Sequence, residues 1–272
     1  MISLTDTHTH IYYTTVEQAL KDMMKRCTAN NIHRLILPNV DTASIDLVYG
    51  TVSRYPDQTF AMLGLHPCSV KEDFPDQLAT IKTFIDSSMD RGTAQAPIYA
   101  IGEIGLDLYW DKSTLKWQQE AFRIQTDWAK TLNLPVSIHC REAYEELFEM
   151  LEEVQDGRLS GVLHCFTGTF EQAQKTIGYG LHLGIGGVVT FKNAGLDQVV
   201  KAIPLQYLVL ETDAPYLAPV PFRGKQNESS YLLYIAEKVA DLHGVSVEEL
   251  SRITSENADR IFKLPKPAIF DR

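Results

Sequence analysis

The sequence predicts an α/β protein folded as a (β/α)8 TIM barrel. Short runs of β-branched or apolar residues alternate along the chain with longer segments of helical periodicity. Eight such runs occur, and their starts lie about 20–40 residues apart, as in successive β/α units. Polar side chains recur at the C-terminal ends of the runs, where barrels place functional residues. The alternative is a doubly wound open sheet.

Each expected strand is rich in Val, Ile, Leu or Thr and ends near Gly, Pro or a polar residue. RLILPNV and LPVSIHC are typical examples. In chain order, the expected strands are residues 2–10, 34–40, 59–67, 97–107, 134–140, 161–168, 181–189 and 207–215.

Between these strands, apolar residues recur on one side of a helix. The segments 16–27, 114–132 and 143–154 carry the clearest stripes. Residues 228–262 predict two further helices, one of which covers the eighth strand from outside. The glycines of GIGGVV (184–189) are interpreted as a closely packed strand with room for a ligand, because strand glycines mark close approaches.

Composition limits the classes of protein that fit. The 272 residues suit one domain, 1–272, and 44% hydrophobic residues allow a large core. A net charge of -10 argues against a protein that coats duplex DNA, which needs a wide basic face. It leaves room for a small basic cluster beside a metal ion.

The four cysteines show no Cys-x-x-Cys spacing, and we expect no disulfide framework. The chain shows neither a signal-peptide pattern nor an apolar run of membrane-spanning length. We therefore expect a cytoplasmic protein with reduced thiols and no membrane contact. Cys140 and Cys165 each follow an inward-facing histidine, which predicts that both pack outward under helices.

Side chains able to bind metal or act in catalysis mark the ends of six expected strands. They converge only if the barrel closes, so the fold and the site depend on each other. They are His8, His10, His66, Glu103, Asp107, His139, Arg141, His164, Glu211 and Asp213.

His8 and His10 are expected to share a face because strand side chains alternate. Together with Glu103, His139, His164 and Asp213 they form a set of six ligands, more than one catalytic ion takes from a protein. A bridging carboxylate between two ions would use them all, and Glu103 is the natural bridge. Mixed imidazole and carboxylate ligands suit zinc, manganese, iron or magnesium, and spacing does not choose among them.

Other polar residues receive simpler interpretations. His33, His182 and His243 are taken as structural. Asp107 either orients a ligand or caps a turn. The roles of Asp6 and Glu211 stay open: Asp6 could orient a ligand, and Glu211 could face inward or fix a neighbouring loop.

Seven motifs occur in one order along the chain: TDTHTH, GLHP, GEIGLD, HCR, HCFTG, LVLETDAPYL and RGKQNE. In combination they resemble the TatD family of metal-dependent deoxyribonucleases, which are amidohydrolase-like barrels. The chain departs from the family pattern at Ile11-Tyr12, where an apolar residue and Asp or Asn are usual. It also departs at Ser229, which replaces a proline.

The resemblance implies a two-metal phosphodiesterase acting on DNA, often as a 3′-5′ exonuclease. It assigns the metal ligands in two groups. One ion would be held by His8, His10, Glu103 and Asp213, and the second by Glu103, His139 and His164.

Substrate contacts follow from the same resemblance. His66 and Arg141 would lie beside the scissile phosphate, and Arg223 and Lys225 would contact the nucleotide backbone. We expect a water activated by two divalent ions (Zn, Mn or Mg), with Asp213 as general base. Tyr109 or Trp110 would stack on a base, or else close the barrel top. The acidic chain would then bind strand ends or short single strands, with no obligate protein partner.

Two alternatives belong to other classes. A related barrel could hydrolyse a cyclic amide, a lactone or a phosphoester. Many such enzymes bridge their metals with a carboxylated lysine on the fourth strand, and GEIGLD has none. A non-catalytic scaffold barrel would be expected to have lost ligands, whereas here the set is complete.

Overall fold

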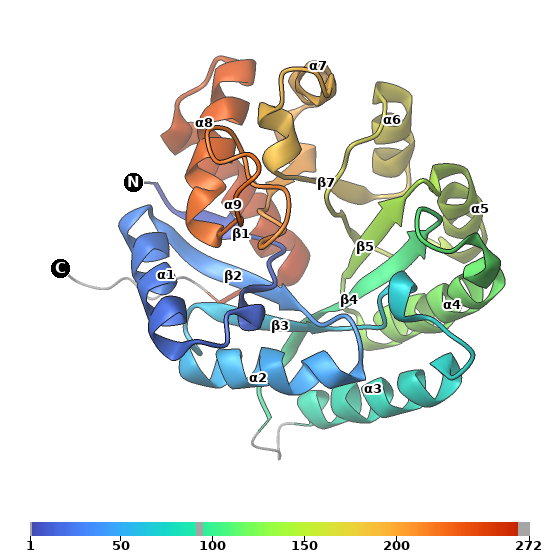
Figure 1. The fold of residues 1–272 in the computed structure, drawn as a ribbon. Helices are drawn as coiled ribbons and strands as arrows, with labels where there is room; N and C mark the ends of the chain where they lie inside the picture. Colours follow the sequence, from blue (N-terminus) through green and yellow to red (C-terminus); the bar gives the residue numbers. More distant parts are fainter. Residues whose placement is uncertain (1, 91–94, 266–272) are drawn as a thin grey trace.

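The computed structural model describes residues 2–90 and 95–265, in which eight parallel strands form one sheet in the order β1 to β8. Figure 1 shows the helices arranged around these strands. The strands are β1 (Leu4–Asp6), β2 (Ile32–Pro38), β3 (Thr59–Leu63), β4 (Ile98–Asp107), β5 (Val136–Arg141), β6 (Gly161–Leu163), β7 (Leu181–Ile185) and β8 (Leu208–Leu210).

Helices follow the strands and bury one apolar face against them. They are α1 (Glu17–Ala29), α2 (Ile45–Arg54), α3 (Phe74–Met89), α4 (Leu115–Leu132), α5 (Tyr144–Val154), α6 (Phe170–Gly178), α7 (Leu196–Ala202), α8 (Leu232–His243) and α9 (Val247–Phe262). Among the helices of the described residues, none combines the length and apolar composition that crossing a membrane requires.

The sheet closes where the chain leaves β1 and β8. The Thr7 amide donates to the Leu210 carbonyl at 3.0 Å, and the Asp213 amide donates to the His8 carbonyl at 2.9 Å. This closure confirms the predicted barrel, and the doubly wound open sheet is wrong.

The predicted helices are present, including the two between residues 228 and 262. The last of them, α9, covers the N-terminal ends of β1 and β8. Ser255 Oγ donates to the Ser3 carbonyl at 2.7 Å, and Asn257 Nδ2 donates to the Leu208 carbonyl at 2.7 Å. The buried guanidinium of Arg34 pairs with Asp259 of the same helix. The helix therefore closes the end of the barrel opposite the polar motifs.

Several strands are shorter than predicted. The expected strands 2–10, 161–168 and 207–215 shrink to three residues each in β1, β6 and β8. The backbone explains two of these endings, because Cys165 (φ 47°) and Asp213 (φ 54°) adopt left-handed conformations that interrupt extended pairing. The chain thus turns inward soon after the strands, over the mouth of the barrel.

Gly184 in β7 is required by close packing. A Cβ atom at this position would lie 2.2 Å from Glu211 Oε2 and 3.0 Å from the His164 Cα. We expect Gly184→Ala to lower the free energy of unfolding by about 1–3 kcal/mol, because neither neighbour has space to retreat. Urea denaturation measures this change.

Gly50→Ala in α2 is the matched control, since a Cβ atom at that position would meet nothing within 4 Å. That change should stabilise the protein by about 0.5–1 kcal/mol through helix propensity. Equal stabilities of the two variants would contradict the packing role of Gly184.

Candidate metal centre

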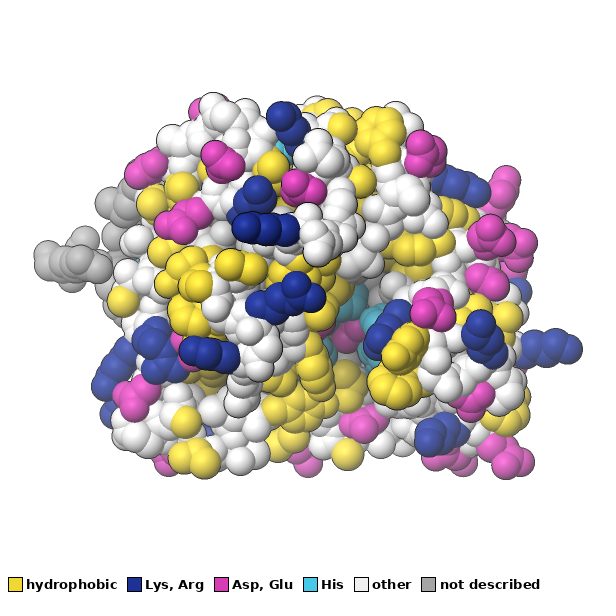
Figure 2. All heavy atoms as spheres, turned by 45° about the horizontal axis from the view of Figure 1, so that its top comes forward, with side chains coloured by type: hydrophobic (Ala, Val, Ile, Leu, Met, Phe, Trp, Pro, Cys, Tyr) yellow, Lys and Arg dark blue, Asp and Glu magenta, His cyan; other side chains and the backbone are white. Residues whose placement is uncertain are grey.

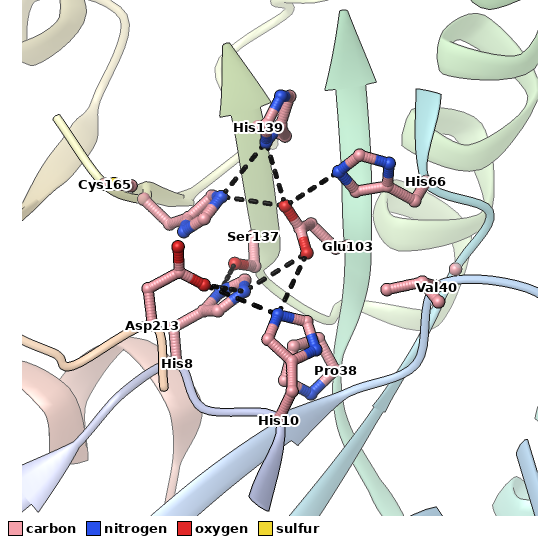
Figure 3. Close-up of polar contacts among 12 residues, drawn as sticks. His8, His10, Pro38, Val40, His66, Glu103, Ser137, His139, Cys165 and Asp213 are labelled. Atoms are coloured by element: carbon pink, nitrogen blue, oxygen red, sulfur yellow. Dashed lines mark hydrogen bonds and ion pairs between the residues drawn. The ribbon is translucent and has the colours of Figure 1, made fainter. Parts of the chain in front are cut away.

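Five histidines and two carboxylates meet at the C-terminal end of the barrel (Figure 3). We call this group the centre. Its members are His8, His10, His66, Glu103, His139, His164 and Asp213. They come from β4, β5 and the segments that follow β1, β3, β6 and β8, so the closed barrel brings together residues more than 200 positions apart. Figure 2 shows the corresponding hollow, with histidine and acidic side chains at its bottom.

Glu103 occupies the middle of the centre and is buried. Its two oxygens face different histidines. On one side, Oε2 lies 3.2 Å from His8 Nε2 and 3.6 Å from His10 Nε2. Asp213 completes this side, with Oδ1 3.4 Å from His10 Nε2 and 4.0 Å from His8 Nε2.

On the other side of the carboxylate, three imidazoles surround Glu103 Oε1. The distances are 2.8 Å to His164 Nε2, 3.0 Å to His139 Nδ1 and 3.2 Å to His66 Nε2. The expected ligands therefore fall into two groups, one on each oxygen of Glu103. His66, expected beside a phosphate, lies in contact with Glu103 itself.

His8 and His10 share a side although β1 ends before them. The intervening backbone stays tethered, because Thr9 N–H donates to the Ile36 carbonyl at 3.1 Å and His10 N–H to the Ala214 carbonyl at 2.7 Å. Thr9 Oγ1 also lies 2.9 Å from Ser229 Oγ, a contact that a proline at position 229 would lack. Ser229, one of the two departures from the family pattern, thus helps to hold the segment that carries both histidines.

Tyr12 is the other departure from the family pattern. Its buried hydroxyl donates to the Pro38 carbonyl at 2.7 Å and accepts from His10 Nδ1 at 2.8 Å. Because the hydroxyl proton goes to Pro38, His10 carries its own proton on Nδ1. His10 Nε2 is the ring nitrogen that faces Glu103 and Asp213, and it would bind a metal ion once it carries no proton.

Three further side chains lie beside the ring nitrogens of His8, His139 and His164 that point away from Glu103. Ser137 Oγ lies 3.1 Å from His8 Nδ1, and Asp107 Oδ2 lies 2.9 Å from His139 Nε2. Glu211 Oε1 lies 3.4 Å from His164 Nδ1. In each case the other ring nitrogen faces Glu103. For His8 and His139 the contact is a hydrogen bond, as in metal sites where an outer group sets the tautomer.

The three acids whose roles the sequence left open, Asp107, Glu211 and Asp6, are all buried. Asp107 makes the contacts that both expected roles require: one oxygen lies beside His139, and the other accepts from the amides of Tyr109 and Trp110 at 3.0 and 3.3 Å. Glu211 both faces inward and fixes a loop, since it accepts from the Cys165 amide at 2.6 Å. Asp6 makes no contact with an imidazole ring in the described structure.

Asp6 instead joins β1 to the segment after β8. It accepts from the Thr212 amide at 2.9 Å and from the Thr212 hydroxyl at 2.6 Å. Burial raises the pKa of Asp6 to about 7, against these hydrogen bonds.

Charge in the centre is strongly coupled. Burial opposes ionisation of Glu103, but the neighbouring histidines, His66 and His164 foremost, outweigh it and hold its pKa well below the usual range. Burial also opposes protonation of His164, yet Glu103 and Glu211 raise its pKa well above the ordinary value. For His139, burial likewise opposes protonation, but the hydrogen bonds with Asp107 and Glu103 outweigh it, so its pKa is raised.

The donor set fits divalent metal ions. Ligand atoms of His8, His10 and Asp213 lie within 4.8 Å of one another, and so do those of His66, Glu103 and His139. The buried Glu211 Oε2 has no hydrogen-bond partner in the described structure. Buried imidazoles and carboxylates converging at this spacing are the ligands that zinc and manganese take from proteins.

The expected substrate residues lie around the centre with contacts of their own. The Arg141 guanidinium stacks 3.6 Å above the Tyr109 ring, at the ends of β5 and β4. In the long segment after β8, Arg223 lies 4.4 Å from the Phe191 ring and Lys225 lies 5.9 Å from the Phe222 ring. No hydrogen bond or ion pair joins Arg223 or Lys225 to the centre within the described residues.

The cysteine interpretation needs one correction. All four cysteines lie in the described residues and are free. Cys140 packs against the main core as expected. Cys165 does not, because β6 ends at Leu163 and the thiol lies in a turn at the mouth. Burial, helped by Asp213 and Glu211, raises its pKa well above the ordinary value.

Two supporting residues escaped sequence reasoning. Ser137 had a usable signal, since it precedes His139 by two positions in β5 and so shares its face. Tyr12 had none, because its contact with His10 depends on the 3₁₀ turn Ile11–Tyr13.

Comparisons with known proteins extend over nearly the whole chain. A family model described as TatD related DNase matches residues 5–263. The Bacillus subtilis protein named "Uncharacterized metal-dependent hydrolase YabD" is 39% identical over 262 residues, which cover 96% of this chain and 99% of that protein. The Escherichia fergusonii protein named 3′-5′ ssDNA/RNA exonuclease TatD is 32% identical over 247 residues, covering 89% of this chain and 92% of that protein.

Among solved structures, the crystal structure of YJJV, a TatD homolog from Escherichia coli K12, superimposes with a TM-score of 0.87 at 27% identity. The match covers 96% of this chain and 98% of that chain.

Proposed function

The chain belongs to the family of TatD related DNases, and from this premise we propose that it removes nucleotides from the 3′ ends of single DNA strands. As a member of this family it is a metal-dependent hydrolase. The observation that carries the proposal is the division of the histidines between the two oxygens of Glu103. A relative named as a 3′-5′ ssDNA/RNA exonuclease supports the choice of substrate.

We assign the ligands of two divalent ions to the two sides of Glu103. His8, His10 and Asp213 would hold one ion with Oε2. His139 and His164 would hold the second with Oε1. Two bound ions would neutralise the charge of a phosphodiester and lower the pKa of water near it.

Asp213 is proposed as the general base as well as a ligand. Burial raises the pKa of this carboxyl, but a hydrogen bond from His10 and the charges of His164 and His8 lower it overall. The carboxylate is therefore ionised at neutral pH and able to accept a proton from the attacking water within about 2.6–3.2 Å.

Arg141 and His66 are proposed to meet the charge that develops on the phosphate. In support of this role, Arg141 is the register partner of Asp107, whose carboxylate contacts His139. Arg223 and Lys225 would contact the backbone of the strand, and the net charge of -10 disfavours wide binding to duplexes.

An assay on a 5′-labelled single-stranded oligonucleotide tests the proposal. Incubation with Mg²⁺, Mn²⁺ or Zn²⁺ should give a ladder that shortens from the 3′ end, and a chelator should stop it. Internal cuts would identify an endonuclease and contradict the proposed exonuclease. Hydrolysis of cyclic amides or lactones without release of nucleotides would favour the alternative substrate class, and an inactive protein with less than one equivalent of metal would favour a scaffold.

Tyr12→Phe should weaken metal binding while leaving the fold intact. Without the hydroxyl, His10 loses the partner that keeps the proton on Nδ1, and losses of outer hydrogen bonds typically cost about 10–100-fold in metal affinity. Competition with a chromophoric chelator measures the affinity. Tyr99→Phe, which removes a hydroxyl near the opposite end of the barrel beside Phe60, serves as the control. Equal affinities of the two variants would contradict this role for Tyr12.

Metal uptake should release protons at pH 6. The pKa values of His139 and His164 are raised above that of an ordinary imidazole, so below that ordinary value both rings are largely protonated and an ion must displace their protons. His8 and His66 have lowered pKa values, chiefly through burial, and contribute none. Apparent affinity should therefore fall as pH falls, by about tenfold per pH unit for each displaced proton. Calorimetry in buffers of different ionisation enthalpy counts these protons, and zero protons would contradict the assignment of both residues.

A further inference from the structure

A cavity of about 450 Å³ opens beside the centre, between the segment after β3 and the segment that joins β4 to α4. We call it the Trp110 pocket. Its lining includes Pro67, Lys71, Asp107, Trp110, Asp111 and Trp117. Asp107 belongs both to this wall and to the surroundings of the centre, where its carboxylate contacts His139 at 2.9 Å. A molecule in the pocket would therefore adjoin whatever occupies the centre.

Exposed aromatic surface distinguishes the pocket. Trp110 is 71% exposed and Trp117 is 39% exposed, although a folded protein normally covers such side chains. They are two of only three tryptophans in the chain. Pro67 adds apolar surface from the other loop. Indole surface left open beside a hydrolytic site suits a planar, aromatic ligand.

Tyr109 is less available for this purpose than the sequence suggested. One face of its ring is covered by the Arg141 guanidinium at 3.6 Å, and its ring packs edge to face with that of Trp110, with centroids 4.9 Å apart. Arg141 lies farther from the Trp110 ring, at 5.7 Å. Tyr109 thus positions Arg141, and the tryptophans remain for the ligand.

One cation, Lys71, lies among the residues that line the pocket. The Lys71 ammonium is exposed and forms no ion pair among the described residues. Asp111, across the pocket, is already used, because it accepts from the amide and the hydroxyl of Ser113 at 2.9 and 2.6 Å. Among the residues that line the pocket, Lys71 is the one cation, beside the acids Glu72, Asp107 and Asp111. It is therefore the lining side chain that could pair with a phosphate.

We propose that the Trp110 pocket binds the nucleobase of a nucleotide adjoining the scissile phosphate, with Trp110 and Trp117 as its stacking surface and Lys71 toward a neighbouring phosphate. This inference rests on the proposed function for the choice of substrate. The volume lies within the range of ligand pockets and suits one nucleotide unit. Stacking on indole is tolerant of base identity, so the pocket would add affinity for a strand and little sequence preference.

Binding of dAMP and of deoxyribose 5-phosphate to the metal-loaded protein tests the pocket. Both probes carry the same phosphate and neither is a phosphodiester, so the base is the difference between them. We expect calorimetry to show dAMP binding about tenfold more tightly, as stacking contributes on this scale. The emission of Trp110 and Trp117 should be quenched by dAMP and much less by the sugar phosphate.

Substitution of the two tryptophans tests whether the preference for dAMP arises in the Trp110 pocket. Trp110→Ala and Trp117→Ala should each remove most of the tenfold preference and raise KM for an oligonucleotide about tenfold, with kcat changed less than about twofold. Trp128→Phe, on the far part of α4 against the core, is the control and should change neither. Lys71→Ala should weaken oligonucleotide binding and lower its salt dependence.

The two proposals can fail separately. Equal affinities for dAMP and deoxyribose phosphate, or tryptophan variants with unchanged KM, would overturn the pocket while DNA hydrolysis stands. Tight dAMP binding that depends on Trp110, in a protein that releases no nucleotides from DNA, would support the pocket and overturn the proposed activity.

Discussion

Replacing Glu103 by Gln is expected to lower hydrolysis by about 10³-fold or more and to remove at least one of the two metal ions proposed to bind beside it. The carboxylate contacts four histidines within 3.2 Å and divides them into two groups. An amide carries no charge, and its NH₂ group would point a donor at one of these groups, so it is a poor bridge.

Elemental analysis and nucleotide release measure the two effects, and circular dichroism checks the fold. Glu149→Gln, on the exposed side of α5, is the matched control and should bind metal and hydrolyse DNA like the unaltered protein. A Glu103→Gln protein that keeps two ions and full turnover would refute the bridge.

Asp213→Asn should cut turnover by about 10²–10⁴-fold, the range expected for loss of a general base. Asparagine is the right replacement because Asp213 has a φ of 54°, a left-handed conformation that Asn tolerates better than most residues. Its backbone contact with His8 should persist, so the fold should not change.

Initial rates at saturating oligonucleotide, together with metal content, separate the two roles of Asp213. A slow variant with two bound ions would identify a base, and a variant that has lost one ion would identify a ligand. Asp57→Asn, in the exposed turn before β3, is the control. Near-normal turnover of Asp213→Asn with its metal retained would contradict both assignments.

The barrel could be predicted because strand and helix periodicity are local properties of the chain. The convergence of the candidate ligands followed from the same pattern, since parallel strands present their C-terminal ends at one mouth. His139 and His164 needed only the knowledge that each ends an apolar run. His8 and His10 share a side as predicted, although tethers to β2 and to the segment after β8 hold them there in place of a regular strand.

Side-chain contacts between loops could not be predicted in the same way. His66 reaches Glu103, Cys165 stays in a turn at the mouth, and Arg141 stacks on Tyr109. Each arrangement depends on how a loop leaves its strand, and small changes in backbone angle move a loop side chain by several ångströms. Periodicity carries no information about such angles.

The sequence by itself therefore determined the architecture, the family and the set of residues able to bind metal, because each is recorded in residue type and spacing. Only the tertiary structure decided how Glu103 divides its histidines, what Tyr12 and Ser229 do at the positions where the family pattern differs, and which aromatic side chains stay uncovered. These features arise where segments distant in the chain meet, and there three-dimensional distance takes the place of sequence spacing.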